Sequence, residues 1–168
     1  MKKELYLIEA QNICSFYNQE KDDHLKELPI KIQWNILSAV KQLQPKVQEF
    51  EEFRNKLTND LQQEYFSDDS EKCEETQVPQ TDDNGNNVID ETGAVVMQDA
   101  KKVKDEFIEE YHTKVNELNI ELQNLMIEKT EYEFKGFDLD KVVENLPNDT
   151  GITIDDINMI SFLDNGDE

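Results

Sequence analysis

The sequence predicts a mainly α protein with a minor β component, built around a long antiparallel helical hairpin. Two segments, 36–61 and 108–125, repeat apolar residues in alternating steps of three and four, which is typical of helices that pack along one seam. The polar segment between them carries turn signals and no such repeat. Since 168 residues is an ordinary length for one domain, a single domain over residues 1–168 is expected.

The N-terminal segment predicts a short strand or helix start, followed by a first helix. Residues 5–8 form a short apolar run, and the helical spacing that follows ends near Asn18. Residues 131–134 alternate like an edge strand. A small sheet that pairs 5–8 with 132–134 is therefore expected to close the base of the hairpin.

The two arms of the hairpin are predicted over residues 29–66 and 98–128. Pro29 suits the first turn of a helix, where an amide has no partner inside the helix, and Pro45 is expected to bend the first arm. Asp99 is the expected N-cap of the second arm.

The seams of the two arms are expected to pack against each other, because a lone helix with such a stripe has nothing to cover it. Antiparallel pairing should place Val47 or Phe50 beside Val115 or Leu118. The seam positions are Val40, Leu43, Val47, Phe50, Leu57 and Leu61 in the first arm, and Ile108, Tyr111, Val115, Leu118, Leu122 and Leu125 in the second.

The insert at 67–97 is predicted to be acidic and flexible, with a small β-hairpin at its end. Residues 67–81 lack apolar periodicity and are rich in acids. Asn-Gly at 84–85 and Thr-Gly at 92–93 are turn signals beside strand-like residues. We therefore expect 67–81 to be mobile and dispensable for folding.

Residues 130–163 are predicted to form a strand and short helices. Asp138 can cap the first of these helices and Thr153 the last. Asp155 and Asp156 would then lie in the first turn of the last helix, where carboxylates complement the helix dipole.

Charge restricts the classes of partner. The chain carries 39 acidic and 17 basic residues, a net charge of −22, and ten of the acids fall within 67–99. A field of this sign repels nucleic acid and anionic membranes and favours basic protein surfaces. No apolar run is long enough for a signal peptide or a membrane span, which predicts a soluble cytoplasmic protein that binds neither nucleic acid nor membrane.

The chain shows no spacing typical of a catalytic, metal or cofactor site. Cys14 and Cys73 have no neighbouring cysteine, and His24 and His112 have no second ligand at metal spacing. The acidic turn around Gly85 resembles a calcium loop, but with this glycine at the sixth loop position two required places fail. We therefore predict that the protein is not an enzyme and has no metal or cofactor.

Two kinds of side chain are candidates for binding a partner protein. Most aromatic residues lie at helical spacing beside the seams and are expected in the core, namely Trp34, Phe50, Tyr65, Phe107 and Tyr111. Phe53 falls beside its seam and is the expected apolar contact. The expected acidic contacts are Asp68, Asp69, Glu74 and Glu75.

The order of these parts resembles a small acidic helical-hairpin family of tailed phages and prophages. The resemblance spans most of the chain and rests on the segments LPIKIQWNILSAVKQLQPKVQEFEEFRNKL, VNELNIELQNLM and TEYEFKGFDLD. The plan is also similar to a prefoldin subunit, in shape alone. The resemblance to the tailed-phage family implies no role for individual residues.

Two functional hypotheses follow. The first is a phage structural or assembly accessory protein, chaperone-like, whose hairpin docks on another phage-encoded protein in the host cytoplasm or in the virion. The alternative is an acidic inhibitor that occupies the basic nucleic-acid-binding channel of a host or defence enzyme. The sequence leaves the oligomeric state open.

Overall fold

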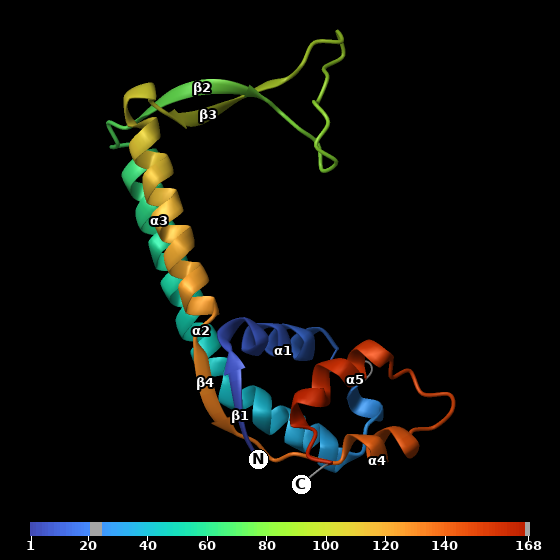
Figure 1. Cartoon of the computed structure of the whole chain (residues 1–168). Helices are drawn as coiled ribbons and strands as arrows, with labels where there is room; N and C mark the ends of the chain where they lie inside the picture. Colours follow the sequence, from blue (N-terminus) through green and yellow to red (C-terminus); the bar gives the residue numbers. More distant parts are fainter. Residues whose placement is uncertain (21–24, 167–168) are drawn as a thin grey trace. The chain divides into compact units, whose positions relative to one another are not determined.

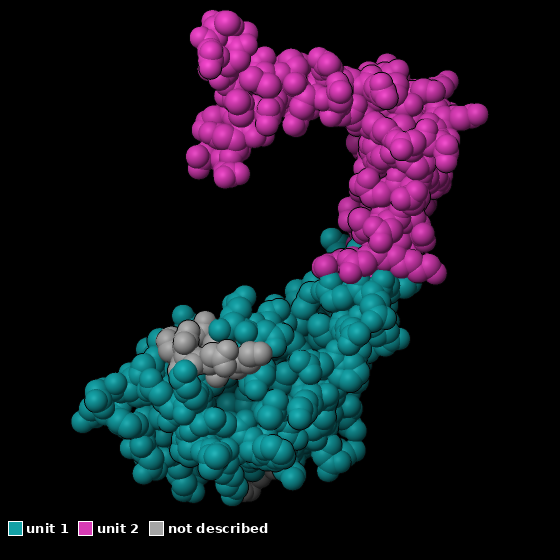
Figure 2. Space-filling model, turned by 180° about the vertical axis from the view of Figure 1, so that it is seen from behind, with its two compact units in different colours: residues 1–53, 122–168 teal, residues 54–121 magenta. Residues whose placement is uncertain are grey.

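The protein is mainly α with a minor β component, as predicted (Figure 1). The computed structural model describes residues 1–20 and 25–166. It divides into two compact units (Figure 2). Unit 1 comprises residues 1–53 and 122–168, and unit 2 comprises residues 54–121.

A small sheet between the two predicted segments is present in unit 1, but Leu5 and Tyr6 pair with Thr130 and Lys129 and not with residues 132–134 as expected. Strand β1 (Lys2–Tyr6) pairs with β4 (Lys129–Glu133) in antiparallel register, with Leu5 opposite Thr130. The strand ends earlier than expected because Leu7 begins helix α1 (Leu7–Glu20). The amide of Tyr6 donates to the Glu9 carboxylate at 2.8 Å, which satisfies one of the free groups at this helix start.

The first predicted arm is confirmed as helix α2 (Ile30–Phe66), which follows the short 3-10 helix η1 (Leu25–Glu27). Pro45 lies inside α2, and the helix is one element on both sides of it. The part of α2 in unit 1 buries a stripe at helical spacing, and Leu43 in this stripe is fully buried. The stripe comprises Ile32, Ile36, Ala39, Val40 and Leu43.

Both predicted caps in the C-terminal segment are confirmed. Asp138 accepts a hydrogen bond from the Lys141 amide at 3.1 Å and begins α4 (Leu139–Glu144). Thr153 and Asp156 bond to each other's backbone amides in a capping box that begins α5 (Ile154–Ile160), and the 3-10 helix η3 (Ser161–Leu163) follows.

The core of unit 1 joins these terminal helices to α1 and α2. The rings of Phe134 and Phe162 meet edge to face, with centroids 5.4 Å apart. The backbone of Gly136 packs closely against Met1 and the Leu163 carbonyl, and a side chain at this position would collide with both. The buried members of the core include Leu5, Ala10, Ile13, Cys14, Leu25, Leu28, Ile36, Val40, Leu43, Phe137, Val142, Ile160 and Leu163.

Unit 2 contains a β-ribbon where the sequence predicted the start of the second arm. Strand β2 (Cys73–Pro79) pairs with β3 (Met97–Val103), followed by the 3-10 helix η2 (Asp105–Phe107). Helix α3 (Ile108–Met126) therefore begins at Ile108, and the predicted start near 98 with Asp99 as a cap is wrong. Asp99 pairs with Gln77 in the ladder, because cross-strand pairing overrides the local helix propensity of residues 98–104.

The predicted flexible segment 67–81 is also corrected, since residues 73–79 of it form β2. The two turn signals in the insert are confirmed: Gly85 and Gly93 have φ values of 79° and 84°, which favour glycine. Of the small β-hairpin expected there, the structure has two isolated antiparallel bridges, between Thr81 and Asn87 and between Ile89 and Val95.

Phe50 and Leu118, which were expected to face each other, line different pockets. In unit 1, Phe50 lines a pocket with Leu125. In unit 2, Leu118 lines a groove with Leu57 and Leu61. A heptad repeat sets which face of a helix is apolar, but a shift of seven residues returns the same pattern, so the sequence did not fix the register.

A polar cluster around Tyr65, here named the Tyr65 cluster, joins three segments of unit 2. The buried Tyr65 hydroxyl donates to Glu110 at 2.8 Å. Lys72 donates to Glu64 at 2.6 Å and to Glu110 at 2.8 Å, and its ammonium lies 4.6 Å from the Tyr65 ring centroid. Lys114 donates to Glu64 at 2.5 Å. The cluster therefore connects the end of α2, the turn after it and the start of α3.

The hydrogen bonds of the Tyr65 cluster shift the ionisation of its members. Bonds from Lys72 and then Tyr65 lower the pKa of Glu110 from its usual 4.5 to about 2. Bonds from Lys114 and Lys72 lower the pKa of Glu64. Burial first, and then the bond to Glu110, raises the pKa of Tyr65. The folded unit thus favours the charged carboxylates and the neutral phenol.

Replacing Leu43 by alanine is expected to lower the free energy of unfolding by about 3 kcal/mol, because it leaves a cavity in a closed core. Chemical denaturation followed by circular dichroism measures this loss. The matched control is Gln44→Ala, which changes an exposed neighbour and should stay within about 0.5 kcal/mol of the parent protein. Equal effects of the two substitutions would contradict the described core.

The free energy of unfolding of unit 2 is expected to decrease as the pH is lowered, because Glu110 becomes protonated. Its pKa is lowered in the folded state, so its contribution is fully present above its usual pKa of 4.5 and is lost as the pH falls towards 2. Denaturation curves of the parent and of Glu110→Gln should therefore differ above pH 4.5 and converge towards pH 2.

The control for this pH dependence is Glu109→Gln, which removes the same charge one residue earlier. The Glu109 side chain has no hydrogen bond or ion pair with any described residue. If Glu109→Gln and Glu110→Gln change the pH dependence equally, net charge explains the effect and the Tyr65 cluster does not.

Candidate functional site

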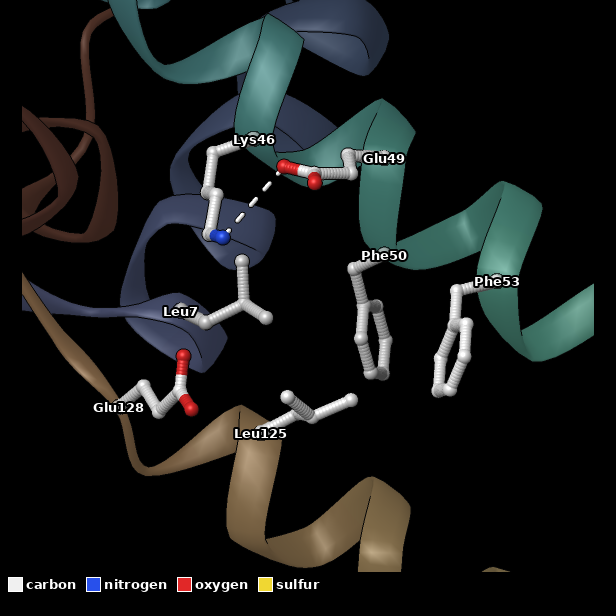
Figure 3. A pocket seen from close by; sticks show the side chains of 7 residues that line it. All are labelled: Leu7, Lys46, Glu49, Phe50, Phe53, Leu125 and Glu128. Atoms are coloured by element: carbon white, nitrogen blue, oxygen red, sulfur yellow. Dashed lines mark hydrogen bonds and ion pairs between the residues drawn. The ribbon is translucent and has the colours of Figure 1, made fainter.

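Unit 1 contains an open apolar pocket with a volume of about 210 Å³ (Figure 3). Leu7, Phe50, Phe53 and Leu125 form its apolar wall. Figure 3 shows the rings of Phe50 and Phe53 pointing from α2 towards Leu125. The charged residues at the pocket are Lys46, Glu49 and Glu128.

Three elements position the pocket. Phe50 and Phe53 are three residues apart on α2 and therefore lie on one side of the helix. Leu125 comes from the last turn of α3, and Leu7 is the first residue of α1. The Leu7 amide donates to the Glu128 carbonyl at 3.1 Å, which holds the start of α1 against the chain segment before β4.

The chemistry of this pocket fits binding. Lys46 and Glu49 form an ion pair at 3.4 Å on α2, and because Glu49 is largely exposed and Lys46 partly so, the pair contributes little to stability. The described residues that line the pocket include no histidine, cysteine, serine or threonine that could act as a nucleophile. An apolar wall with charges at its edge is typical of a site that receives an apolar side chain.

Phe53 lies where the sequence analysis expected an accessible aromatic residue. It is half-buried, whereas its neighbour Phe50 is 6% exposed and belongs to the interior, as expected. Tyr65 is also buried, and Phe107 and Tyr111 are half-buried.

Trp34 is the aromatic residue for which the expectation was wrong. It is 61% exposed, and Ile30, one turn earlier on α2, is 84% exposed. The signal was present in the sequence: Trp34 lies between Ile32 and Ile36 of the buried stripe and so points away from it. The exposed face also carries Lys31.

The four acidic candidates lie in unit 2, and two of them are already engaged. Asp68 accepts from Lys101 at 2.5 Å and Glu74 pairs with Lys102 at 2.8 Å, and these bonds lower the pKa of both carboxyls. Glu75 lies opposite Lys101 in the ladder. Asp69 is exposed and has no side-chain partner among the described residues. Asp68, Glu74 and Glu75 line one open pocket.

The remaining reactive side chains are separated from one another. Burial raises the pKa of the Cys14 thiol to about 11, and Cys73 is a second free cysteine. His112 is exposed on α3, and His24 lies outside the described residues. Among the side chains that the structure describes, no three histidine, cysteine or carboxylate groups gather closely enough to hold a metal ion.

Over residues 1–20 and 25–166, no helix combines the length and the apolar content needed to cross a bilayer.

Trp34 is the single tryptophan of the chain, so its fluorescence tests its exposure directly. Emission is expected near that of N-acetyltryptophanamide, with strong quenching by acrylamide, and the maximum should move little on unfolding in guanidinium. A blue-shifted emission with weak quenching would place Trp34 in the core and contradict the described face.

Comparison with protein-family models, with curated proteins and with solved structures finds no match to this chain.

Proposed function

We propose that this protein is a non-catalytic docking protein that holds a partner protein through the apolar pocket of unit 1. The observation that carries the proposal is the open apolar pocket lined by the half-buried Phe53 and Leu125 over the buried Phe50. A pocket of about 210 Å³ has room for one bulky apolar side chain of a partner.

In this proposal, the predicted helical hairpin supplies the docking wall. Phe53 comes from the first predicted arm and Leu125 from the second, so the two arms would form the docking wall together. The resemblance to the tailed-phage family makes a phage-encoded structural or assembly protein the first partner to test. The protein would then act as an assembly accessory in the host cytoplasm or in the virion.

The alternative of an acidic inhibitor is less well supported by the side chains named for it. Asp68 and Glu74 are held by lysines of unit 2. Each lysine offsets one of the negative charges that a basic channel would attract, which reduces the net attraction of this region.

The test replaces a side chain of the pocket wall by a larger one that occupies the pocket. Leu125→Trp should occupy the cavity with the larger ring and exclude the partner's side chain, while the fold is retained. In affinity capture from phage-infected cells, quantified by mass spectrometry, recovery of the partner is expected to fall by at least about tenfold, as for loss of a central contact.

The matched control is Ile127→Trp, which adds the same ring two residues later at a position that is 65% exposed and outside the pocket. It should leave capture unchanged, and circular dichroism should show the same helicity for both variants. Full recovery of the same partner by folded Leu125→Trp would rule out docking through this pocket.

A further inference from the structure

The segment that joins β2 to β3 is folded by a closed ring of three backbone hydrogen bonds. Gln80 donates to the Val96 carbonyl at 2.8 Å, Val88 donates to Gln80 at 2.8 Å, and Val96 donates to Val88 at 2.9 Å. The three residues are spaced eight apart, so two loops of equal length connect them. We name residues 79–97 the tip.

The two loops of the tip repeat the same turn. Asp82 accepts from the amides of Asn84 and Asn86, both at 2.9 Å. Asp90, eight residues later, accepts from the amides of Thr92 at 2.8 Å and of Ala94 at 3.1 Å. One glycine with positive φ completes each turn. These hydrogen bonds shape the tip without a hydrophobic core.

The tip exposes a continuous apolar patch that its fold does not require. Ile89, Val95 and Met97 are 61%, 41% and 46% exposed. Ile89 lies opposite Val95 in an isolated bridge, Val95 precedes Met97, the first residue of β3, by two positions, and Met97 lies opposite Pro79. The register therefore places Pro79, Ile89, Val95 and Met97, here named the tip patch, on one side of the ring. Grouped exposed apolar residues are typical of interaction surfaces.

The charges beside the tip patch indicate the chemistry of its partner. Asp83 and Glu91 occupy the same place in the two turns, and neither side chain has a hydrogen bond or ion pair with any described residue. In each turn, the first acid, Asp82 or Asp90, accepts the hydrogen bonds of the loop, and the second, Asp83 or Glu91, can face a partner. Residues 73–100 contain no lysine or arginine, so the surroundings of the patch are uniformly negative.

We infer that the tip patch docks on a protein surface that offers an apolar recess bordered by lysine or arginine side chains. Nucleic acid and anionic membranes would be repelled by the acids. A second copy of this chain is disfavoured for the same reason, since its net charge is −22. This inference concerns unit 2 and does not depend on the pocket proposed in unit 1.

The test uses the full chain with methyl-labelled Ile, Val and Met and two amphipathic helical peptides as probes. One peptide combines leucine with lysine, and the other combines leucine with glutamate. The lysine peptide is expected to shift the methyl signals of Ile89, Val95 and Met97, with weaker binding at high salt, and the glutamate peptide should not. The methyl signal of Ile120, which is 58% exposed on α3, should stay in place.

Three variants separate the apolar and the charged contributions. Ile89→Ser with Val95→Ser should raise the Kd for the lysine peptide by at least about tenfold. Asp83→Asn with Glu91→Gln should raise it less and flatten its salt dependence, because these changes keep the turn hydrogen bonds. Ile120→Ser is the matched control and should leave the Kd unchanged.

The folding of the tip in each variant is checked by the amide signals of Asn84, Asn86, Thr92 and Ala94, which report the two turns. If the lysine peptide shifts methyl groups elsewhere and not at the tip patch, the inference is wrong, and this mapping needs no variant. Equal binding of both peptides would also overturn it. Self-association of the parent chain in sedimentation, lost in Ile89→Ser with Val95→Ser, would overturn it as well. The patch would then be a contact between copies of this chain.

Discussion

Unit 2 depends on the hydrogen bonds and ion pairs around Tyr65, because it has little apolar interior. Among its residues, 54–121, only Tyr65 and Val103 are buried hydrophobic residues. A single ammonium, that of Lys72, bonds to Glu64 of α2 and to Glu110 of α3 while it lies over the Tyr65 ring. Partly shielded charges of this kind must keep their partners, so they fix how the helix ends meet the β-ribbon.

The features that could be predicted from the sequence are those that depend on a few neighbouring residues. The Asp138 and Thr153 caps require only a short polar side chain before a helical segment. The turns at Gly85 and Gly93 require only a residue that accepts positive φ. Phe53 lies beside its seam and is half-buried, whereas Phe50 on the seam is buried, and this difference is also local information.

The features that could not be predicted depend on residues far apart in the chain. The segment around Asp99 has acceptable helix propensity, and only its pairing with β2 makes it a strand. The partner of Phe50 was misplaced because a repeat cannot distinguish equivalent registers. Asp68 was expected to be available, but Lys101 is 33 residues away in sequence and engages it. The exposure of Trp34 is different, because the period of the buried stripe already indicated it.

The two cysteines differ in a way that makes the chain convenient for spectroscopy. The buried Cys14 has a raised pKa and so little thiolate at neutral pH, whereas Cys73 is half-buried and lies in the other unit. A maleimide dye should therefore label Cys73 selectively. Trp34 in unit 1 can serve as the energy-transfer donor and the dye in unit 2 as the acceptor, with no mutation of the natural sequence. The transfer efficiency then reports the separation of the two units in solution, both alone and as partners bind.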